Sequence, residues 1–176
     1  MRLIAIIALL ALLISPCIAE LNSVTTGPYK VSFDLGPKAE NSTIEAKEGF
    51  DTEARDGTAY IQYDINIEGD TPHTAFISIS KWQKELSSSA LKNETTHQLK
   101  VNGNSDSPIV TRTIDGHEGL ITEFDLAYNS YKPRCYFAIW LIDSYTAVKL
   151  ASTYPWDEGT LQLLKTIHIE EINSTA

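Results

Sequence analysis

The stretch Ile61-Gln62-Tyr63-Asp64-Ile65-Asn66-Ile67 alternates strictly between apolar and polar side chains. Successive side chains of a β-strand point to opposite faces of a sheet, so this period of two predicts a strand with one buried and one solvated face. A second stretch alternates in the same way, with apolar residues at Tyr29, Val31, Phe33 and Leu35. Both stretches predict a protein built on half-buried strands, the pattern typical of an antiparallel sheet.

Further strands are predicted along the chain. They cover residues 73–81, 109–114, 120–126, 134–142 and 145–153, with a last edge strand around Ile167, Ile169 and Ile172. Residues 134–142 are almost continuously apolar, which is typical of a strand buried on both faces. We expect strands 29–35, 61–67 and 73–81 to pair in sequence order. Residues 38–57 contain few apolar anchors, so we expect a loop there.

Two other segments have helical spacing. Apolar residues recur at intervals of three or four within residues 82–101 and again near residues 160–167, which predicts one or two helices. The predicted fold class is therefore α+β: a mostly antiparallel sheet of about six to seven strands with one or two packed helices, preceded by an N-terminal signal helix.

The N-terminus predicts export. Met1 and Arg2 give a short positive start, residues 3–14 carry no polar side chain, and small residues precede a cleavage position between Ala19 and Glu20. This is the layout of a secretory signal peptide. We therefore expect a secreted or extracytoplasmic protein.

Two alternatives to cleavage and release stay open. Residues 3–19 could remain as a membrane anchor, although Pro16 ends the apolar run short of the roughly 20 residues that span a bilayer. Residues 14–17 also resemble a lipobox that would lipidate Cys17, and Pro16 departs from that pattern.

The mature chain is predicted to be one acidic domain. The 176 residues include 14 basic and 23 acidic side chains, and removing the first nineteen leaves about 157 residues with a formal charge of −10. That length suits a single domain. The negative charge argues against nucleic acid as a partner, and against a membrane surface except through an uncleaved N-terminal segment. We divide the chain into a signal peptide (1–19), a loose lead (20–27), a single α+β domain (28–172) and a tail (173–176).

Three segments carry a resemblance to a known family. They are Gly27-Pro28-Tyr29-Lys30-Val31-Ser32-Phe33, Ile114-Asp115-Gly116-His117-Glu118-Gly119 and Leu161-Gln162-Leu163-Leu164-Lys165-Thr166-Ile167-His168-Ile169. Their order resembles that of small exported proteins with the PsbP-like α/β/α sandwich, over most of residues 27–172. The resemblance implies an accessory or assembly role, and it supplies no catalytic residue.

One group of residues could carry chemistry. The chain has no GxSxG, HExxH, CxxC or Gly-rich phosphate motif, and we predict no cofactor. The best cluster is Asp115, His117, Glu118, Glu123 and Asp125. Glu123 and Asp125 share a face of the predicted strand, and carboxylates with an imidazole can bind a divalent cation. The alternative is that Asp115 simply forms part of a turn and that Glu123 and Asp125 lie on the solvent-exposed face of the following strand.

Other residues suggest surface features. Sequons at Asn41, Asn93 and Asn173 lie in segments expected to be loop or terminus and would accept glycans in an exported chain, unless they occur by chance.

Cys135 is predicted to be a buried thiol that acts as a small hydrophobe.

Amphipathic aromatic residues are frequent in the later half of the chain. They are Tyr128, Tyr131, Tyr136, Tyr154 and Trp156. Such residues favour interfaces when they are partly exposed, and the alternative is that they cap the ends of buried strands.

Two function classes follow from these observations. The favoured one is a non-catalytic binding or accessory module whose partner is a protein, an envelope component or a small ligand. The alternative is a small extracytoplasmic metal-dependent enzyme or hydrolase that uses the acidic face near His117. A deep pocket that gathers His117 with carboxylates would favour the second class.

Overall fold

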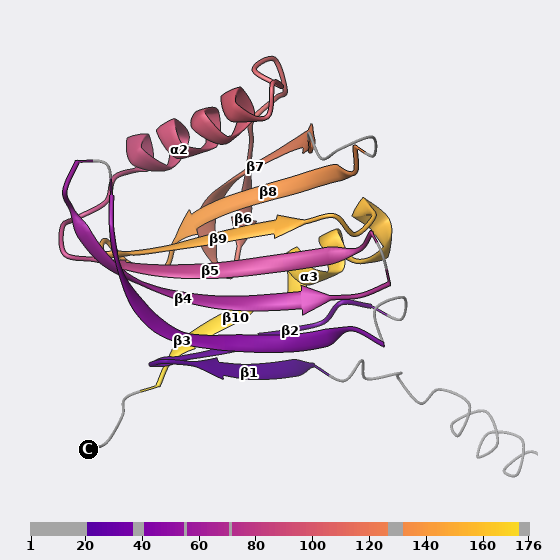
Figure 1. Cartoon of the computed structure of the whole chain (residues 1–176), viewed down its shortest axis with the longest axis horizontal. Helices are drawn as coiled ribbons and strands as arrows, with labels where there is room; N and C mark the ends of the chain where they lie inside the picture. Colours follow the sequence, from indigo (N-terminus) through magenta and orange to yellow (C-terminus); the bar gives the residue numbers. More distant parts are fainter. Residues whose placement is uncertain (1–20, 37–40, 55, 71, 127–131, 173–176) are drawn as a thin grey trace, which may run out of the picture.

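Ten strands and two α-helices make up the part of the chain that the structure describes (Figure 1). The structure is a computed structural model, and it describes residues 21–36, 41–54, 56–70, 72–126 and 132–172. Both sheets are antiparallel, which confirms the α+β class. The predicted signal helix and the cleavage position between Ala19 and Glu20 lie outside these residues.

The larger sheet has seven strands in the order β3-β4-β5-β9-β8-β7-β6. Their bounds are Thr43–Glu53 (β3), Ala59–Glu68 (β4), Thr74–Trp82 (β5), Val110–Ile114 (β6), His117–Asp125 (β7), Arg134–Leu141 (β8) and Thr146–Ser152 (β9). Two runs of consecutive hairpins, β3-β4-β5 and β6-β7-β8-β9, join where β5 pairs with β9. Strand β8 buries Phe137 on one face and Trp140 on the other, which confirms the predicted doubly buried strand.

The smaller sheet has the order β1-β2-β10. It consists of β1 (Asn22–Thr26), β2 (Tyr29–Phe33) and the short edge strand β10 (His168–Glu171). The turn between β1 and β2 needs glycine for two reasons. Gly27 has a φ of 54°, and a Cβ atom there would come within 2.1 Å of the ring of Tyr63.

The main core joins the two sheets. Buried side chains of β2, such as Val31 and Phe33, form one cluster with Ile65 and Ile77 of the larger sheet. Helix α3 (Thr160–Thr166), which follows the 3-10 turn η2 (Trp156–Glu158), contributes Leu163 to this cluster. The alternating apolar residues of β2 and β4 therefore point toward each other across the space between the sheets.

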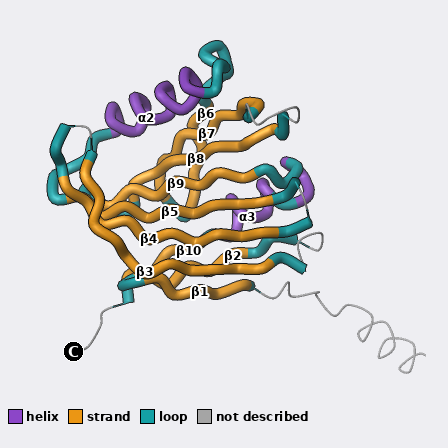
Figure 2. Tube along the Cα trace, in the orientation of Figure 1, coloured by secondary structure: helices purple, strands orange, loops and turns teal. Residues whose placement is uncertain are grey.

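A second, smaller core lies on the opposite face of the larger sheet. Helix α2 (Ser88–Val101) packs Leu91 and Leu99 against Phe124 and Phe137, and it lies toward the β7–β8 end of the sheet (Figure 2). The helix begins later than the predicted residue 82. Residues 82 and 86 donate their backbone N–H groups to Tyr145 and Ser144, which keeps this segment extended against the neighbouring turn.

Three expectations about the N-terminal half were wrong. Part of the predicted loose lead forms β1, and most of the predicted loop 38–57 forms the long edge strand β3. Strand β3 is mostly exposed and β1 is only partly buried, so backbone hydrogen bonds hold both strands without the apolar alternation that sequence analysis detects. The strand at residues 29–35 also does not pair with the strand at 61–67, because β2 belongs to the other sheet.

Candidate functional site

The five residues of the predicted acidic cluster are spread along the whole length of β7. Asp115 lies in the turn before this strand, His117 and Glu118 are its first residues, and Glu123 and Asp125 lie at its far end. At about 3.3 Å per residue, His117 and Glu123 are roughly 20 Å apart, so the five cannot ligate one ion together. Among the residues that the structure describes, no three His, Cys, Asp or Glu side chains are grouped as a metal site.

The far end of β7 is an ion-pair network. Arg134 lies opposite on β8, with Nη1 2.8 Å from Glu123 Oε1 and Nε 3.0 Å from Asp125 Oδ1. The two carboxylates therefore do share a face, as their spacing predicted. All three side chains are about half exposed, so the network contributes little to stability.

Asp115 has a different role, because it joins the two sheets. Its Oδ1 lies 2.7 Å from Nδ1 of His168, and its Oδ2 accepts the backbone N–H of Ile169 at 2.9 Å. An ionised carboxylate only accepts hydrogen bonds, so Nδ1 of His168 carries the proton. Asp115 has a φ of 50°, a conformation that Asp tolerates better than most residues.

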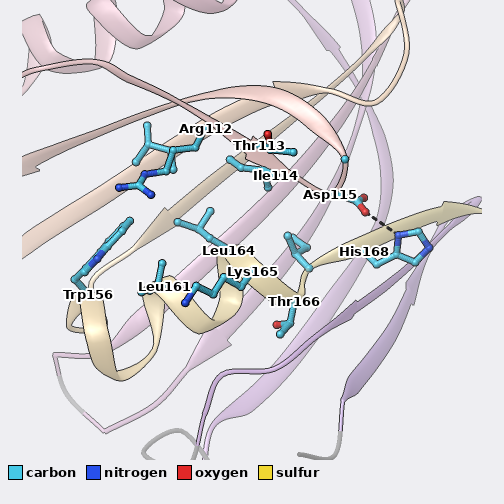
Figure 3. A pocket seen from close by; sticks show the side chains of 13 residues that line it. Arg112, Thr113, Ile114, Asp115, Trp156, Leu161, Leu164, Lys165, Thr166 and His168 are labelled. Atoms are coloured by element: carbon cyan, nitrogen blue, oxygen red, sulfur yellow. Dashed lines mark hydrogen bonds and ion pairs between the residues drawn. The ribbon is translucent and has the colours of Figure 1, made fainter.

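A groove of about 600 Å³ opens beside this contact, between β6, α3 and the start of β10 (Figure 3). Its floor is apolar and includes the buried side chains of Ile114, Ile121 and Leu164. The volume lies within the range of about 300–1,000 Å³ that is usual for small-molecule sites. The groove is larger than the two other hollows described below, which have volumes of about 320 and 360 Å³.

Two cations border the groove. Arg112 projects from β6 with its guanidinium carbon 5.7 Å from the ring centroid of Trp156, and Lys165 projects from α3 (Figure 3). Among the described residues, neither side chain forms an ion pair with a carboxylate. Asp115 is the acid that lines the groove, and both its oxygens already accept hydrogen bonds. The groove is therefore locally positive in a protein that is strongly acidic overall.

The groove continues past Trp156 into a second hollow of about 320 Å³. Arg112, Ile121 and Trp156 line both hollows, and Tyr136 extends the second one with its ring 5.2 Å from that of Trp156. Trp156 therefore borders both hollows. The second hollow adds aromatic and apolar surface to the site, together with the carboxylate of Glu123, which is paired with Arg134.

Sequence analysis missed the two cations of this site. Arg112, Trp156 and Lys165 belong to β6, η2 and α3, and no motif links them. Trp156 and Tyr136 did stand out as amphipathic aromatics, and both are partly exposed, which agrees with an interface role. Tyr128 and Tyr131, named for the same reason, lie outside the described residues, and Tyr154 is buried.

Among the described residues, the asparagines of the predicted sequons and the cysteine do not belong to the lining of the groove. Asn41 is exposed just before β3, and Asn93 is exposed on α2 and not in the predicted loop, whereas Asn173 lies outside the described residues. Cys135 is buried, as predicted, and burial raises the pKa of its thiol to about 11, so the thiol is protonated at neutral pH. Cys17 lies outside the described residues.

No helix within the described residues is long and apolar enough to span a membrane. Comparison with known proteins adds no relative: no family model matches the chain, and no curated protein and no solved structure matches it. The case for function therefore depends on the site itself.

Proposed function

We propose that this protein is a non-catalytic binding domain that works outside the cytoplasm and holds a small amphiphilic anion in the groove between β6 and α3. The observation that carries the proposal is the pair of cations, Arg112 and Lys165, which have no carboxylate partner among the described residues and stand over an apolar floor. The extracytoplasmic setting is supported by the signal-like N-terminus.

The residues of the groove can recognise both the anionic group and the apolar part of such a ligand. A carboxylate or sulfonate group would be attracted to Arg112 and Lys165, and Arg112 is already oriented by its contact with Trp156. The apolar part would cover Ile114, Ile121 and Leu164, and burying it contributes roughly 25 cal/mol per Å². An uncharged amphiphile would gain only the second contribution.

A hydrolase has less support from the same groove. Asp115 and His168 are arranged as a base and the group that orients it, but His168 is 67% exposed and the lining residues include no Ser or Cys. The hydroxyl group of Thr166 already donates to the backbone oxygen of Gln162 at 2.8 Å. Nucleophilic catalysis needs an activated nucleophile within reach of the base.

The test is a binding titration of the purified protein with anilinonaphthalene sulfonate, followed by displacement with dodecanoate and with dodecanol. We expect dodecanoate to compete and dodecanol of equal chain length to compete much more weakly. Arg112→Gln and Lys165→Gln should each weaken dodecanoate binding about fivefold, which corresponds to about 1 kcal/mol.

Matched controls separate this site from general charge effects. Lys84→Gln removes an exposed lysine that is already paired with Asp56, and Lys92→Gln removes an exposed lysine of α2. Both control variants should bind dodecanoate like the parent protein. Equal affinity for the alkanol and the alkanoate, or equal losses in test and control variants, would contradict the proposal.

A further inference from the structure

A second hollow lies on the opposite face of the larger sheet and is independent of the groove. Helix α2 covers this face over β7 and β8, but β4, β5 and β9 extend beyond the helix. A hollow of about 360 Å³ remains between the C-terminal half of α2 and these strands. Gln98 and Asn102 line it from the helix side, and Gln62, Ser78 and Lys149 line it from the sheet.

This hollow has no net charge to attract an ion. Nζ of Lys149 lies 3.0 Å from Oε1 of Glu94 on α2, so its charge is compensated. The hollow therefore differs from the groove, where the cations have no such partner. A neutral ligand fits it better than an anion or a cation.

The polar groups of the hollow have unused hydrogen-bonding capacity. The side-chain nitrogen of Gln62 donates to both carboxylate oxygens of Asp64 at 2.9 and 3.1 Å. The side-chain nitrogens of Gln98 and Asn102 donate to Glu94 Oε1 at 3.1 Å and to the backbone oxygen of Gln98 at 2.8 Å. Within the described residues, the side-chain carbonyl oxygens of these three amides accept no hydrogen bond, so they are free to accept one from a ligand.

Ser78 adds an independent observation. Ser78 is only 2% exposed and lines the hollow, so its hydroxyl group is available to a ligand that enters it. Phe76 and Phe124 supply aromatic surface in the same hollow.

We infer that this hollow binds a neutral saccharide. A sugar presents several hydroxyl donors, which match the free amide oxygens and the Ser78 hydroxyl. It also has an apolar C–H face, which packs on the electron-rich face of an aromatic ring such as Phe76. The hollow lies at the small end of the range for ligand sites, so the ligand is a monosaccharide, a disaccharide or the end of a longer glycan.

The experiment is a ¹H–¹⁵N NMR titration of the full chain with glucose, galactose, N-acetylglucosamine, maltose and cellobiose, and with glucuronate as a charged comparison. We expect at least one neutral sugar to shift the amide signals of Ser78, Gln98 and Lys149. The signals of Arg112 and Lys165 in the groove should stay in place. Ser78→Ala and Phe76→Ala should each weaken that binding about fivefold to tenfold.

Ser144→Ala is the matched control, because this serine is exposed in the turn between β8 and β9 and lies outside the lining of the hollow. It should leave sugar affinity unchanged. The inference is overturned if no neutral sugar shifts the three amide signals, if only glucuronate does, or if Ser78→Ala and Phe76→Ala bind like the parent. Dodecanoate binding in the groove is measured separately, so either site can fail without the other.

Discussion

The carboxylate of Asp115 binds the ring of His168 across 53 residues of sequence, with 2.7 Å between Oδ1 and Nδ1. The same carboxylate accepts the backbone N–H of Ile169 through Oδ2. Strand β10 is an edge strand, and this N–H lies on its open side, so Asp115 satisfies a group that the sheet does not. One turn residue thus connects the larger sheet to the smaller one at the end of the groove.

Asp115→Ala should lower the free energy of unfolding by about 1–3 kcal/mol, because the partly buried N–H of Ile169 loses its acceptor. Asp115→Asn should cost less, since its amide oxygen can still accept that bond and Asn tolerates a positive φ. Asp115→Gly relieves the backbone but removes the acceptor, so it should remain destabilised. Urea unfolding of the three variants measures the difference. Equal stability of the Ala and Asn variants would contradict this role.

Ile65→Ala should destabilise the protein by about 2–5 kcal/mol, because Ile65 is fully buried between the two sheets. Ile61 is the matched control, since it lies on the same strand and the same face but is 39% exposed. Ile61→Ala should cost about 1 kcal/mol or less. The comparison is made by thermal or urea unfolding. Similar losses at both positions would mean that the sheets do not enclose Ile65.

The Glu94–Lys149 ion pair should make stability depend on acid pH. Burial disfavours the charged form of Glu94, but the charge of Lys149 and hydrogen bonds from Lys149 and Gln98 outweigh it and lower the pKa of Glu94 below its ordinary 4.5. A lowered folded pKa contributes stability above pH 4.5, and this contribution is lost as the pH falls through the folded pKa.

Glu94→Gln removes that contribution and should cost roughly 1 kcal/mol near neutral pH, since the pair is about one-third exposed. We expect the free energies of unfolding of the parent and the variant, measured with urea, to differ at about pH 7 and to become nearly equal at about pH 3. Glu85→Gln, on an exposed side chain, is the control and should show no convergence of this size. If the difference in free energy of unfolding between the parent and Glu94→Gln were independent of pH, the Glu94–Lys149 ion pair would not be its cause.

Expression in a glycosylating secretory host should modify Asn41 in preference to Asn93. Asn41 is exposed before β3, whereas the sequon of Asn93 lies within α2 and its Thr95 is fully buried, with its hydroxyl group donating to the backbone oxygen of Leu91. Intact mass of the parent, Asn41→Gln and Asn93→Gln proteins distinguishes the two sites. A glycan that survives Asn41→Gln and disappears with Asn93→Gln would reverse this order.

N-terminal sequencing of the exported protein should begin at Glu20. Residues 3–14 are apolar and Pro16 interrupts them before the length of a membrane span, so we expect cleavage and release. A mature chain that retains Met1 or Arg2 would instead support an anchor, and one that begins with a lipid-modified Cys17 would support the lipobox.

Much of the sheet could be predicted because a strand with one buried face alternates between apolar and polar residues in the sequence. Residues 61–67 and 73–81 alternate clearly and form the hairpin β4–β5, and the apolar run at 134–142 is the doubly buried β8. An exposed strand does not show this alternation. Strand β3 is largely solvated and is held by backbone hydrogen bonds to β4, so its composition resembles that of a loop.

The sequence alone determined which side chains turn inward, because alternation depends only on the local backbone. It could not determine what they pack against: β2 and β4 have the same pattern but belong to different sheets. The candidate site shows the same limit, since Arg112, Trp156 and Lys165 meet only after β6, η2 and α3 are placed together. Only the tertiary structure decided these contacts, because they depend on long-range packing and not on local periodicity.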